Sequence, residues 1–271
     1  MKLLENSQSE SASIGIFGGS GFYSLLENVR EVNIETPYGP TSDKIALGER
    51  NGKKIAFLPR HGKDHTIPPH KINFRANMWA MKALGVKFII SPSAAGSLQK
   101  HIEPGHFVVV DQFVDRTTGR VDTFYDGPAV THMSFANPYC DYLRTIASES
   151  IKKTGVVCHD SGTVVVIQGP RFSSKAESKW FSKQGWEVIN MTQYPEVVLA
   201  RELEMAFVNV SLITDFDSGV DEVKKPDSVE DILEVFGKNI ENIKKSILYM
   251  IDSIDVEKEC ESHKALSFSR F

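Results

Sequence analysis

The chain has 271 residues, of which 41% are hydrophobic and 24% charged, with a formal net charge of -4 and a pI near 6.1. This length suits one large α/β domain, and no Pro/Gly/Ser-rich or highly charged linker divides the chain, so we expect a single domain. A slightly acidic protein has no general attraction for nucleic acid or for an anionic membrane surface. Any anion site must therefore be local, and the partner is expected to be a small molecule.

Cys140, Cys158 and Cys260 show no CxxC or metal-type spacing and are too few for a disulfide framework, which favours a reducing cytoplasm. Residues 1–10 are polar and acidic where a signal peptide needs an apolar core. No apolar run reaches the ~18 residues that a membrane span requires. We therefore expect a soluble cytoplasmic protein, with loosely held or partner-docked ends at 1–12 and 255–271.

Nine segments rich in β-branched and aromatic residues, bounded by Gly, Pro or Asn, predict strands at 13–17, 32–35, 44–48, 54–58, 86–91, 106–111, 162–168, 186–190 and 206–213. Five segments with apolar residues three and four positions apart predict helices at 74–84, 138–154, 174–184, 194–203 and 228–254. Their alternation predicts an α/β fold with a mostly parallel central sheet and helices on both faces. The strands between 32 and 58 are joined by short turns and are expected to be antiparallel. The prediction is one mixed, twisted sheet with a core over about 13–255.

Five apolar runs end abruptly in polar clusters. Three suit an anion, at Gly18-Gly19-Ser20-Gly21, Arg60-His61-Gly62 and Ser93-Ala94-Ala95-Gly96-Ser97; a mixed cluster spans 168–174 and an acidic one spans 214–217. In open α/β sheets, ligands bind outside the carboxyl ends of the strands. The clusters therefore predict one composite pocket, with phosphate on one side and a proton-bearing ring on the other.

Each anion cluster also has a structural explanation. The loop around Ser20 can present backbone N–H groups and a hydroxyl to phosphate, but it matches neither G-x-G-x-x-G nor a P-loop and can be a simple turn. Arg60 can bind phosphate through two parallel hydrogen bonds, with His61 donating beside it, or both can be ordinary surface residues. The cluster at 93–97 offers a hydroxyl and small residues, or a close-packed turn.

A metal site at His61, His65 and His70 is disfavoured. His61 and His65 are four residues apart, but Gly62 and the Pro68-Pro69 pair break any continuous helix. There is also no HExxH glutamate. We expect no metal.

The remaining clusters suit a sugar and a base. Thr192 can reach phosphate or a sugar hydroxyl, Glu196 a sugar hydroxyl, and Met191 an apolar sugar face; core packing and an exposed helix start are the alternatives. Asp215 and Asp217 flank Phe216 at strand spacing, so their side chains share one face if the strand continues. Adjacent carboxylates raise one pKa, so one acid can share a proton with a ring nitrogen, unless this is a solvated loop or a cation site.

Together these motifs resemble the methylthioadenosine phosphorylase branch of the purine nucleoside phosphorylase family, over about residues 13–255. The resemblance implies a homo-oligomer, either a trimer or a dimer of trimers, with no cofactor or metal and with inorganic phosphate as co-substrate. It implies phosphate-dependent cleavage of 5′-methylthioadenosine to adenine and 5-methylthioribose 1-phosphate, in purine and methionine salvage. The alternative is a broader phosphorylase of adenosine or 6-oxopurine nucleosides.

The resemblance also implies roles for individual residues. Phosphate is expected to contact Ser20, Arg60, His61, Ser93, Thr192 and the backbone amide of Ala94. Met191 is expected to support the ribose, with Glu196 and Phe216 as further substrate contacts. Asp215 is expected to share a proton with N7 of the leaving base, and Asp217 to accept from the 6-amino group, which favours adenine. Relatives specific for 6-oxopurines carry Asn in place of the first aspartate.

The 5′ end of the nucleoside is expected to lie near His132 of a neighbouring subunit and near Val229 and Ile232, which can equally be helix core. Ser173 is expected to be a specificity position, and residues 218–227 a mobile lid. Ser93 stands where relatives often have Thr, and Gln193-Tyr194 and 218–220 differ from the mammalian enzyme. The alternatives from other classes are a hydrolase that uses water and a non-catalytic nucleoside binder. Neither needs a phosphate site, so neither explains the three anion-type clusters.

Overall fold

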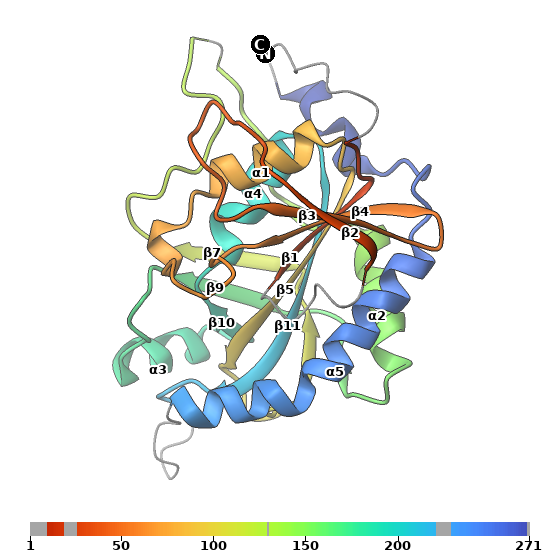
Figure 1. Ribbon diagram of the computed structural model, residues 1–271. Helices are drawn as coiled ribbons and strands as arrows, with labels where there is room; N and C mark the ends of the chain where they lie inside the picture. The colour runs from red at the N-terminus through yellow and green to blue at the C-terminus, as the bar shows by residue number, and fades with distance from the viewer. Residues whose placement is uncertain (1–9, 19–25, 129, 221–228, 270–271) are drawn as a thin grey trace.

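The structure of the protein, a computed structural model, describes residues 10–18, 26–128, 130–220 and 229–269, without the side chains at 229–233, 236 and 268. Within these ranges the strands join into one 11-stranded mixed sheet (Figure 1). Eight strands follow the order β2-β3-β4-β1-β5-β10-β9-β7, while β11 pairs with β5 and β6, and β8 pairs with β6. The sheet confirms the predicted α/β fold.

In chain order, the strands are β1 (Ile14–Gly18), β2 (Glu27–Val32), β3 (Ile45–Arg50), β4 (Lys53–Pro59), β5 (Phe88–Ser97), β6 (Phe107–Val109), β7 (Gln112–Arg116), β8 (Cys158–His159), β9 (Thr163–Ile167), β10 (Val188–Asn190) and β11 (Ala206–Phe216). The helices are η2 (Pro69–Lys71), α1 (Phe74–Ala83), α2 (Asp141–Lys152), α3 (Lys175–Lys183), α4 (Gln193–Glu202), α5 (Val229–Ser253) and η3 (Glu261–Phe268).

The sheet mixes two kinds of pairing. β1 runs parallel to β4 and β5, and β5 runs parallel to β11 over nearly its whole length. β2, β3 and β4 form an antiparallel ribbon, as predicted, and β10 is antiparallel to β5. Because β1, β4, β5 and β11 share one direction, their carboxyl ends meet at the same edge of the sheet.

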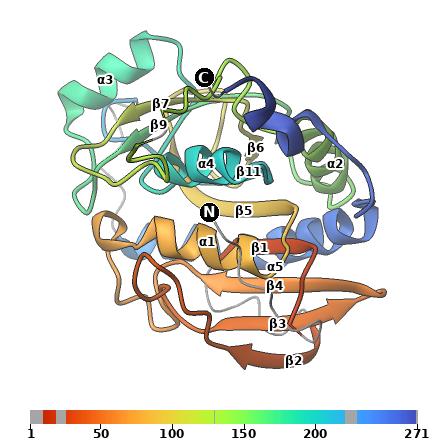
Figure 2. The ribbon, with the colours of Figure 1, turned by 90° about the horizontal axis from the view of Figure 1, so that it is seen from above.

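Helices cover both faces of the sheet. α1 and α4 lie on one side and α2 and α5 on the other (Figures 1 and 2). The strands alternate between the two cores, since successive side chains point to opposite faces. In β11, Phe207 packs in the core that includes residues of α1 and α4, whereas Val208 packs in the core that includes residues of α2 and α5. The two cores pack against opposite faces of the sheet and so fix the position of its edge, where the polar residues at the strand ends lie.

The structure corrects several element boundaries. The predicted strand at 32–35 is instead β2 at Glu27–Val32, where five of six residues are exposed and no apolar alternation marks the strand. β7 and β8 were not predicted. β5 and β11 extend to Ser97 and Phe216, beyond their predicted ends, because the polar clusters continue the β5–β11 ladder.

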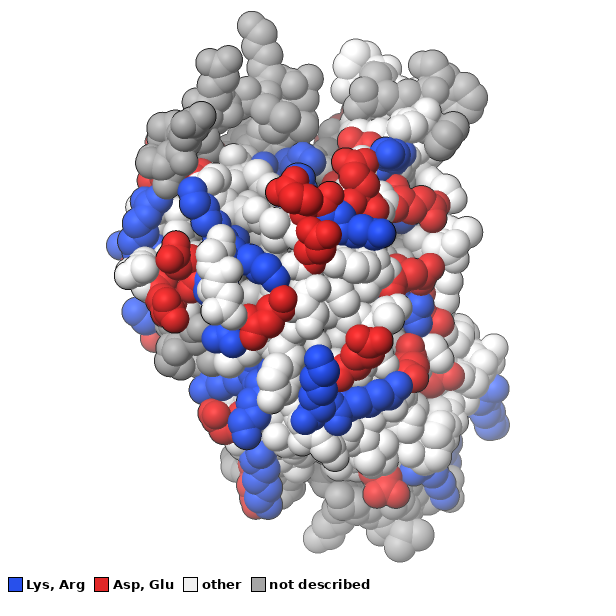
Figure 3. All heavy atoms as spheres, turned by 90° about the vertical axis from the view of Figure 1, so that its right-hand side faces the viewer, with Lys and Arg blue, Asp and Glu red and all other residues white. Residues whose placement is uncertain are grey.

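Charges of both signs are interspersed on the face shown in Figure 3. Arg50 pairs with Asp252 at 2.7 Å and joins the β3–β4 turn to α5, and Lys152 pairs with Asp160 at 2.8 Å. Such pairs fit the small net charge of the chain. In the described part of the chain, every helix is too short or too polar to cross a bilayer.

Candidate active site

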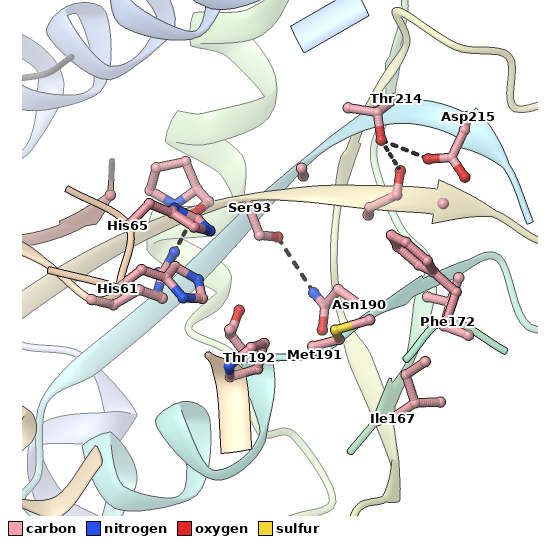
Figure 4. Close-up of a pocket in the computed structure, with 18 of the residues that line it drawn as sticks. His61, His65, Ser93, Ile167, Phe172, Asn190, Met191, Thr192, Thr214 and Asp215 are labelled. Carbon is pink, nitrogen blue, oxygen red and sulfur yellow. Dashed lines mark hydrogen bonds between the residues drawn. The ribbon is translucent and has the colours of Figure 1, made fainter. Parts of the chain in front are cut away.

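A cavity of about 650 Å³ opens at the polar edge of the sheet (Figure 4). Its wall comes from the ends of β1, β4, β5, β9, β10 and β11, the segments that come after them, and one face of α5. The lining residues are Gly18, Arg60, His61, Gly62, Lys63, His65, Pro69, Pro92, Ser93, Ala94, Ala95, Gly96, Ile167, Phe172, Ile189, Asn190, Met191, Thr192, Thr214, Asp215, Asp217, Ile240 and Ile243. The strand-end clusters predicted from the sequence thus share one cavity.

Eight of the predicted site residues lie in this wall, namely Arg60, His61, Ser93, Ala94, Met191, Thr192, Asp215 and Asp217. Glu196, Phe216, Ser173 and His132 lie outside it. Ser20 falls outside the described residues, as do the side chains of Val229 and Ile232 and most of the predicted lid at 218–227.

Arg60 is buried and almost fully engaged by the protein. Its Nε donates to Glu196 Oε1 at 2.7 Å and its Nη2 to Glu196 Oε2 at 3.2 Å. Nη2 also donates to Ser91 Oγ at 2.7 Å, and Nη1 donates to the Pro92 carbonyl at 2.9 Å. Since a guanidinium has five N–H donors, one remains. The expectation of two parallel hydrogen bonds from Arg60 to phosphate is therefore wrong.

Glu196 lies behind Arg60 and is only 1% exposed. Its Oε1 accepts from Arg60, and its Oε2 accepts from Arg60 and from Ser91 Oγ at 2.8 Å. The expectation that Glu196 contacts substrate is wrong for this structure, because both carboxylate oxygens face the buried guanidinium. Glu196 positions Arg60 instead.

His61 presents an acceptor to the cavity. Its Nδ1 lies 2.9 Å from the Ile67 carbonyl, which can only accept, so the proton is on Nδ1 and the neutral ring has a bare Nε2. Burial, followed by the Arg60 charge, lowers the pKa of His61 to about 4. At neutral pH, His61 therefore accepts through Nε2, contrary to the expectation that it donates.

Ser93 is arranged as a donor. Its Oγ accepts from Asn209 Nδ2 at 3.0 Å and from Asn190 Nδ2 at 3.3 Å, the second bond being drawn in Figure 4. Two accepted bonds leave the hydroxyl proton of Ser93 to be donated, and within the protein it can reach Ser211 Oγ at 3.4 Å, which itself donates to Asn209 Oδ1. Thr192 is the N-cap residue of α4, yet its side chain makes no capping bond. Both hydroxyls thus lie in the wall, where an anion can accept from them.

Asp215 and Asp217 lie together at the other end of the cavity. The β5–β11 register shifts between Ile213 and Asp215, which makes Thr214 a bulge residue. Thr214 Oγ1 donates to Asp215 Oδ1 at 2.7 Å, as Figure 4 shows. The residue opposite is Gly96, at which an added Cβ would lie 3.5 Å from Asp215 Oδ2 and 3.6 Å from Asp217 Cβ. The two carboxylates thus share one face of the strand, as predicted.

Ser173 holds Asp217. Its hydroxyl lies 2.6 Å from both carboxylate oxygens, and Asp217 is buried. The next residue, Ser174, opens α3 with a capping box to Glu177, which fixes the start of the helix. Phe216 points to the opposite face of β11 and packs against the Leu98 and Val165 cluster. The expectation that Phe216 contacts substrate is wrong because strand alternation turns it away.

Met191 is placed by a glycine. At Gly169, φ is +65°, a backbone conformation that favours glycine, and an added Cβ would lie 2.7 Å from Met191 Sδ, so a larger residue would displace the Met191 side chain. This gives the mixed cluster at 168–174 two structural functions, since Gly169 backs Met191 and Ser173 holds Asp217.

The sequence did not identify the apolar part of the wall. Phe172, Ile167 and Ile189 line one part of it, and Ile240 and Ile243 of α5 line another. Residues such as Ile240 and Ile243, three positions apart on a helix, also fit ordinary core packing, so the pattern could not identify them. Phe172 could have been identified from the sequence, because it lies between Arg171 and Ser173 in a predicted polar cluster.

His132 lies away from the cavity of its own chain. Its backbone N–H donates to the Ser269 carbonyl at 2.9 Å, next to the C-terminal η3. His61 and His65 stack with ring centroids 4.4 Å apart. Within the residues that the structure describes, no three His, Cys, Asp or Glu side chains are grouped as metal ligands.

Fold and site together define a phosphorylase. The family model described as the phosphorylase superfamily matches residues 13–252, and the chain belongs to this superfamily. It is 48% identical to the S-methyl-5′-thioadenosine phosphorylase of Thermofilum pendens, over 95% of this chain and 98% of the relative. It is 43% identical to the purine nucleoside phosphorylase of Streptomyces coelicolor, over 94% of each chain. A methylthioadenosine phosphorylase from an Antarctic soil metagenomic library superposes with a TM-score of 0.92 at 40% identity, covering 97% of this chain and 93% of that one.

Proposed function

We propose that the protein cleaves 5′-methylthioadenosine with inorganic phosphate, giving adenine and 5-methylthioribose 1-phosphate. The observation that carries this proposal is a single cavity with anion-binding groups at one end and two adjacent carboxylates at the other. The relatives named as methylthioadenosine phosphorylases, similar over almost the whole chain, support the choice of substrate.

At the anion end, phosphate is bound mainly by neutral hydrogen-bonding groups. Ser93 and Thr192 supply hydroxyls, Arg60 supplies its one remaining N–H, and Ala94 adds a backbone amide in this proposal. Ser20 belongs to the same set by resemblance. Groups fixed in advance stabilise charge without reorganising during the reaction.

Breaking the glycosidic bond builds positive charge on the ribose. A phosphate held beside C1′ stabilises that charge and then forms the new C–O bond, so no covalent enzyme intermediate is required. Met191 lines the cavity between its two ends (Figure 4), and we propose that it supports the sugar. The reaction is a glycosyl transfer to phosphate.

The departing purine takes a proton at N7. We propose that Asp215 shares that proton and that Asp217, held by Ser173, accepts from the 6-amino group. Protonation makes the base a better leaving group. Two acceptors suit adenine, whereas a 6-oxo group would face a carboxylate oxygen with no proton between them.

The apolar wall suits the methylthio group. Ile240 and Ile243 come from the same helix that carries Val229 and Ile232, and they line the cavity. We propose that this wall receives the 5′ substituent, with His132 contributed by a neighbouring subunit. An apolar surface favours a methylthio group over a 5′-hydroxyl, which it would leave without a partner.

The remaining parts of the proposal concern assembly and setting. We propose a homo-oligomer, either a trimer or a dimer of trimers, because a site that uses His132 in trans is incomplete in one chain. We propose that the reaction needs no cofactor or metal, since phosphate binding, charge stabilisation and base protonation all come from the residues named above. The expected setting is purine and methionine salvage in the cytoplasm.

The direct test measures base release by the purified protein from methylthioadenosine, adenosine and inosine, with and without phosphate. We expect fast, phosphate-dependent release of adenine from methylthioadenosine. Release without phosphate would show a hydrolase, and no release from any nucleoside would show a binder. A higher rate with inosine would favour the broader phosphorylase that the Streptomyces coelicolor relative suggests.

Asp215→Asn tests how the base is recognised. N7 and the 6-substituent are neighbours on the purine, so an amide at position 215 can donate to a 6-oxo group but cannot supply a proton to N7. We therefore expect the ratio of kcat/KM for methylthioinosine over methylthioadenosine to rise by about tenfold or more. Ser93→Ala is the matched control, since it acts at the phosphate end and should leave this ratio unchanged. An unchanged ratio in Asp215→Asn would show that Asp215 does not contact the base.

A further inference from the structure

At the anion end of the cavity, Glu196 offsets the buried charge of Arg60, and Lys63 is a further cationic side chain among the described lining residues. Arg60 and Glu196 are 4% and 1% exposed and form a buried ion pair joined by two hydrogen bonds. Ser91 closes the arrangement by accepting from Arg60 and donating to Glu196. Because Glu196 offsets the guanidinium charge, an incoming dianion gains less from Arg60 than it would from an unpaired arginine.

His61 adds an acceptor rather than a second charge. Its Nδ1 proton is committed to the Ile67 carbonyl, and burial together with Arg60 keeps the ring neutral. His65 stacks on His61, and its electrostatic effect lowers the pKa of His61 further. Among the residues that the structure describes, the anion end of the cavity therefore offers donors from Arg60, Ser93 and Thr192, with Lys63 also in the wall, and an acceptor, His61 Nε2.

A tetrahedral anion without a proton cannot satisfy such a set. An oxygen lone pair placed against the bare Nε2 is repelled, and a buried acceptor without a donor costs free energy. A monoprotonated oxyanion meets both demands, because its charged oxygens accept from the donors while its O–H donates to His61.

We propose that this subsite selects an oxyanion that carries its own proton, with His61 Nε2 accepting the O–H of HPO4²⁻. The proposal rests on the proposed function, in which phosphate is the co-substrate, and deepens it by naming the protonation state that the site recognises. Arsenate keeps one proton at neutral pH and is accepted. Sulfate and monofluorophosphate have the same shape and the same double negative charge but no O–H, and are rejected.

The test uses the full-length protein and steady-state cleavage of methylthioadenosine at a pH where phosphate is mainly the dianion. Phosphate and arsenate are varied as co-substrates, and sulfate and monofluorophosphate are added as competitors. We expect the inhibition constants of the two proton-free anions to exceed the KM for phosphate by about tenfold or more, the cost of one unsatisfied buried acceptor. The KM for arsenate should lie close to that for phosphate.

Two variants separate selection from simple affinity. His61→Gln offers both a donor and an acceptor, so the ratio of the sulfate constant to the phosphate KM should fall to within about threefold of one. Ser93→Ala removes a donor used by every anion, so both constants should rise while their ratio stays at the wild-type value. Circular dichroism and thermal melting establish that both variants are folded.

Each outcome is decisive. Equal constants for sulfate and phosphate in the wild-type protein overturn the proposal, even if His61→Gln fails to fold. A wild-type ratio that persists in folded His61→Gln also overturns it, because His61 would not be the selecting group. Base release that needs no phosphate would instead overturn the proposed function, so the two failures are distinguishable.

Discussion

Burial of His61 links the stability of the fold to pH. Its pKa is about 4 in the folded protein against an ordinary value of 6.5, so between these values only the unfolded chain binds the proton. Stability conferred by the neutral ring is present above pH 6.5 and is lost as the pH falls toward 4, with a full effect of about 3 kcal/mol.

Urea denaturation of the wild type and of His61→Gln, at neutral pH and near pH 4 and without phosphate or sulfate, measures this dependence. We expect the free energy of unfolding of the wild type to fall more on acidification, by about 2–3 kcal/mol, than that of His61→Gln. An equal fall in both proteins would contradict the assignment of this pH dependence to His61.

Ser173 should matter to the nucleoside end alone. Ser173→Ala removes the hydroxyl that lies 2.6 Å from both oxygens of Asp217, and a hydrogen bond to a charged group contributes about 1.5–3 kcal/mol. We expect kcat/KM for methylthioadenosine to fall at least about tenfold while the KM for phosphate stays within about twofold. Ser173→Thr keeps the hydroxyl and should retain most activity; equal losses in both variants would indicate a packing effect.

At the residue scale, the sequence identified the polar groups at the end of each strand but not the partner that each group takes. Arg60 and His61 could be placed in the pocket because they come directly after an apolar strand. The partners of the Arg60 N–H groups could not be predicted, because Glu196 is 136 positions away. In the sequence, Glu196 fits an exposed acidic residue at the start of a helix equally well. The tautomer of His61 likewise depends on the Ile67 carbonyl, which no side-chain pattern reports.

At the scale of elements, α3 and the turn after β11 form one support for Asp217. Gly219 N–H donates to Ser178 Oγ at 2.9 Å, and Ser218 Oγ donates to the Ser173 carbonyl at 3.1 Å. A Cβ on Gly219 would lie 2.7 Å from the Lys175 carbonyl oxygen and 2.9 Å from Lys179 N. Any side chain at 219 must therefore displace the start of α3.

Gly219→Ala should consequently lower stability by about 1–3 kcal/mol and reduce activity through Ser173. Because both substitutions act on Asp217, the double variant with Ser173→Ala should lose less activity than the two single losses combined. Gly237→Ala is the control, since a Cβ there meets nothing within 4 Å on an exposed stretch of α5. Fully additive losses of activity would show that α3 does not act through Ser173.

Sequence periodicity predicted the buried elements well and the boundary elements poorly. The strands that became β1 and β4 contain continuous apolar runs, which only a buried strand or helix explains. β2 is exposed over most of its length and carries charges, so it lacks the alternation that reveals a half-buried strand. The polar residues at the end of β5 were expected to leave the sheet, but pairing with β11 keeps them within it.

At the scale of the whole molecule, the proposed oligomer has a genetic test. If His132 completes the site of a neighbour, mixed oligomers of Arg60→Ala and His132→Ala chains contain some sites with both residues intact. We expect coexpression to restore activity well above that of either variant alone, in particles three or six times the 30.2 kDa chain by sedimentation. Active monomers, or no restoration in mixed oligomers, would contradict a shared site.

The long strand β5 borders both ends of the cavity. Its Pro92 carbonyl accepts from Arg60, and four positions further along, Gly96 faces Asp215. These points are only about 13 Å apart on one extended backbone that is paired on both sides. A displacement of β5 on phosphate binding must then also move Gly96, and with it the part of the cavity that receives the purine. By thermodynamic reciprocity, the factor by which phosphate tightens nucleoside binding must equal the factor by which nucleoside tightens phosphate binding.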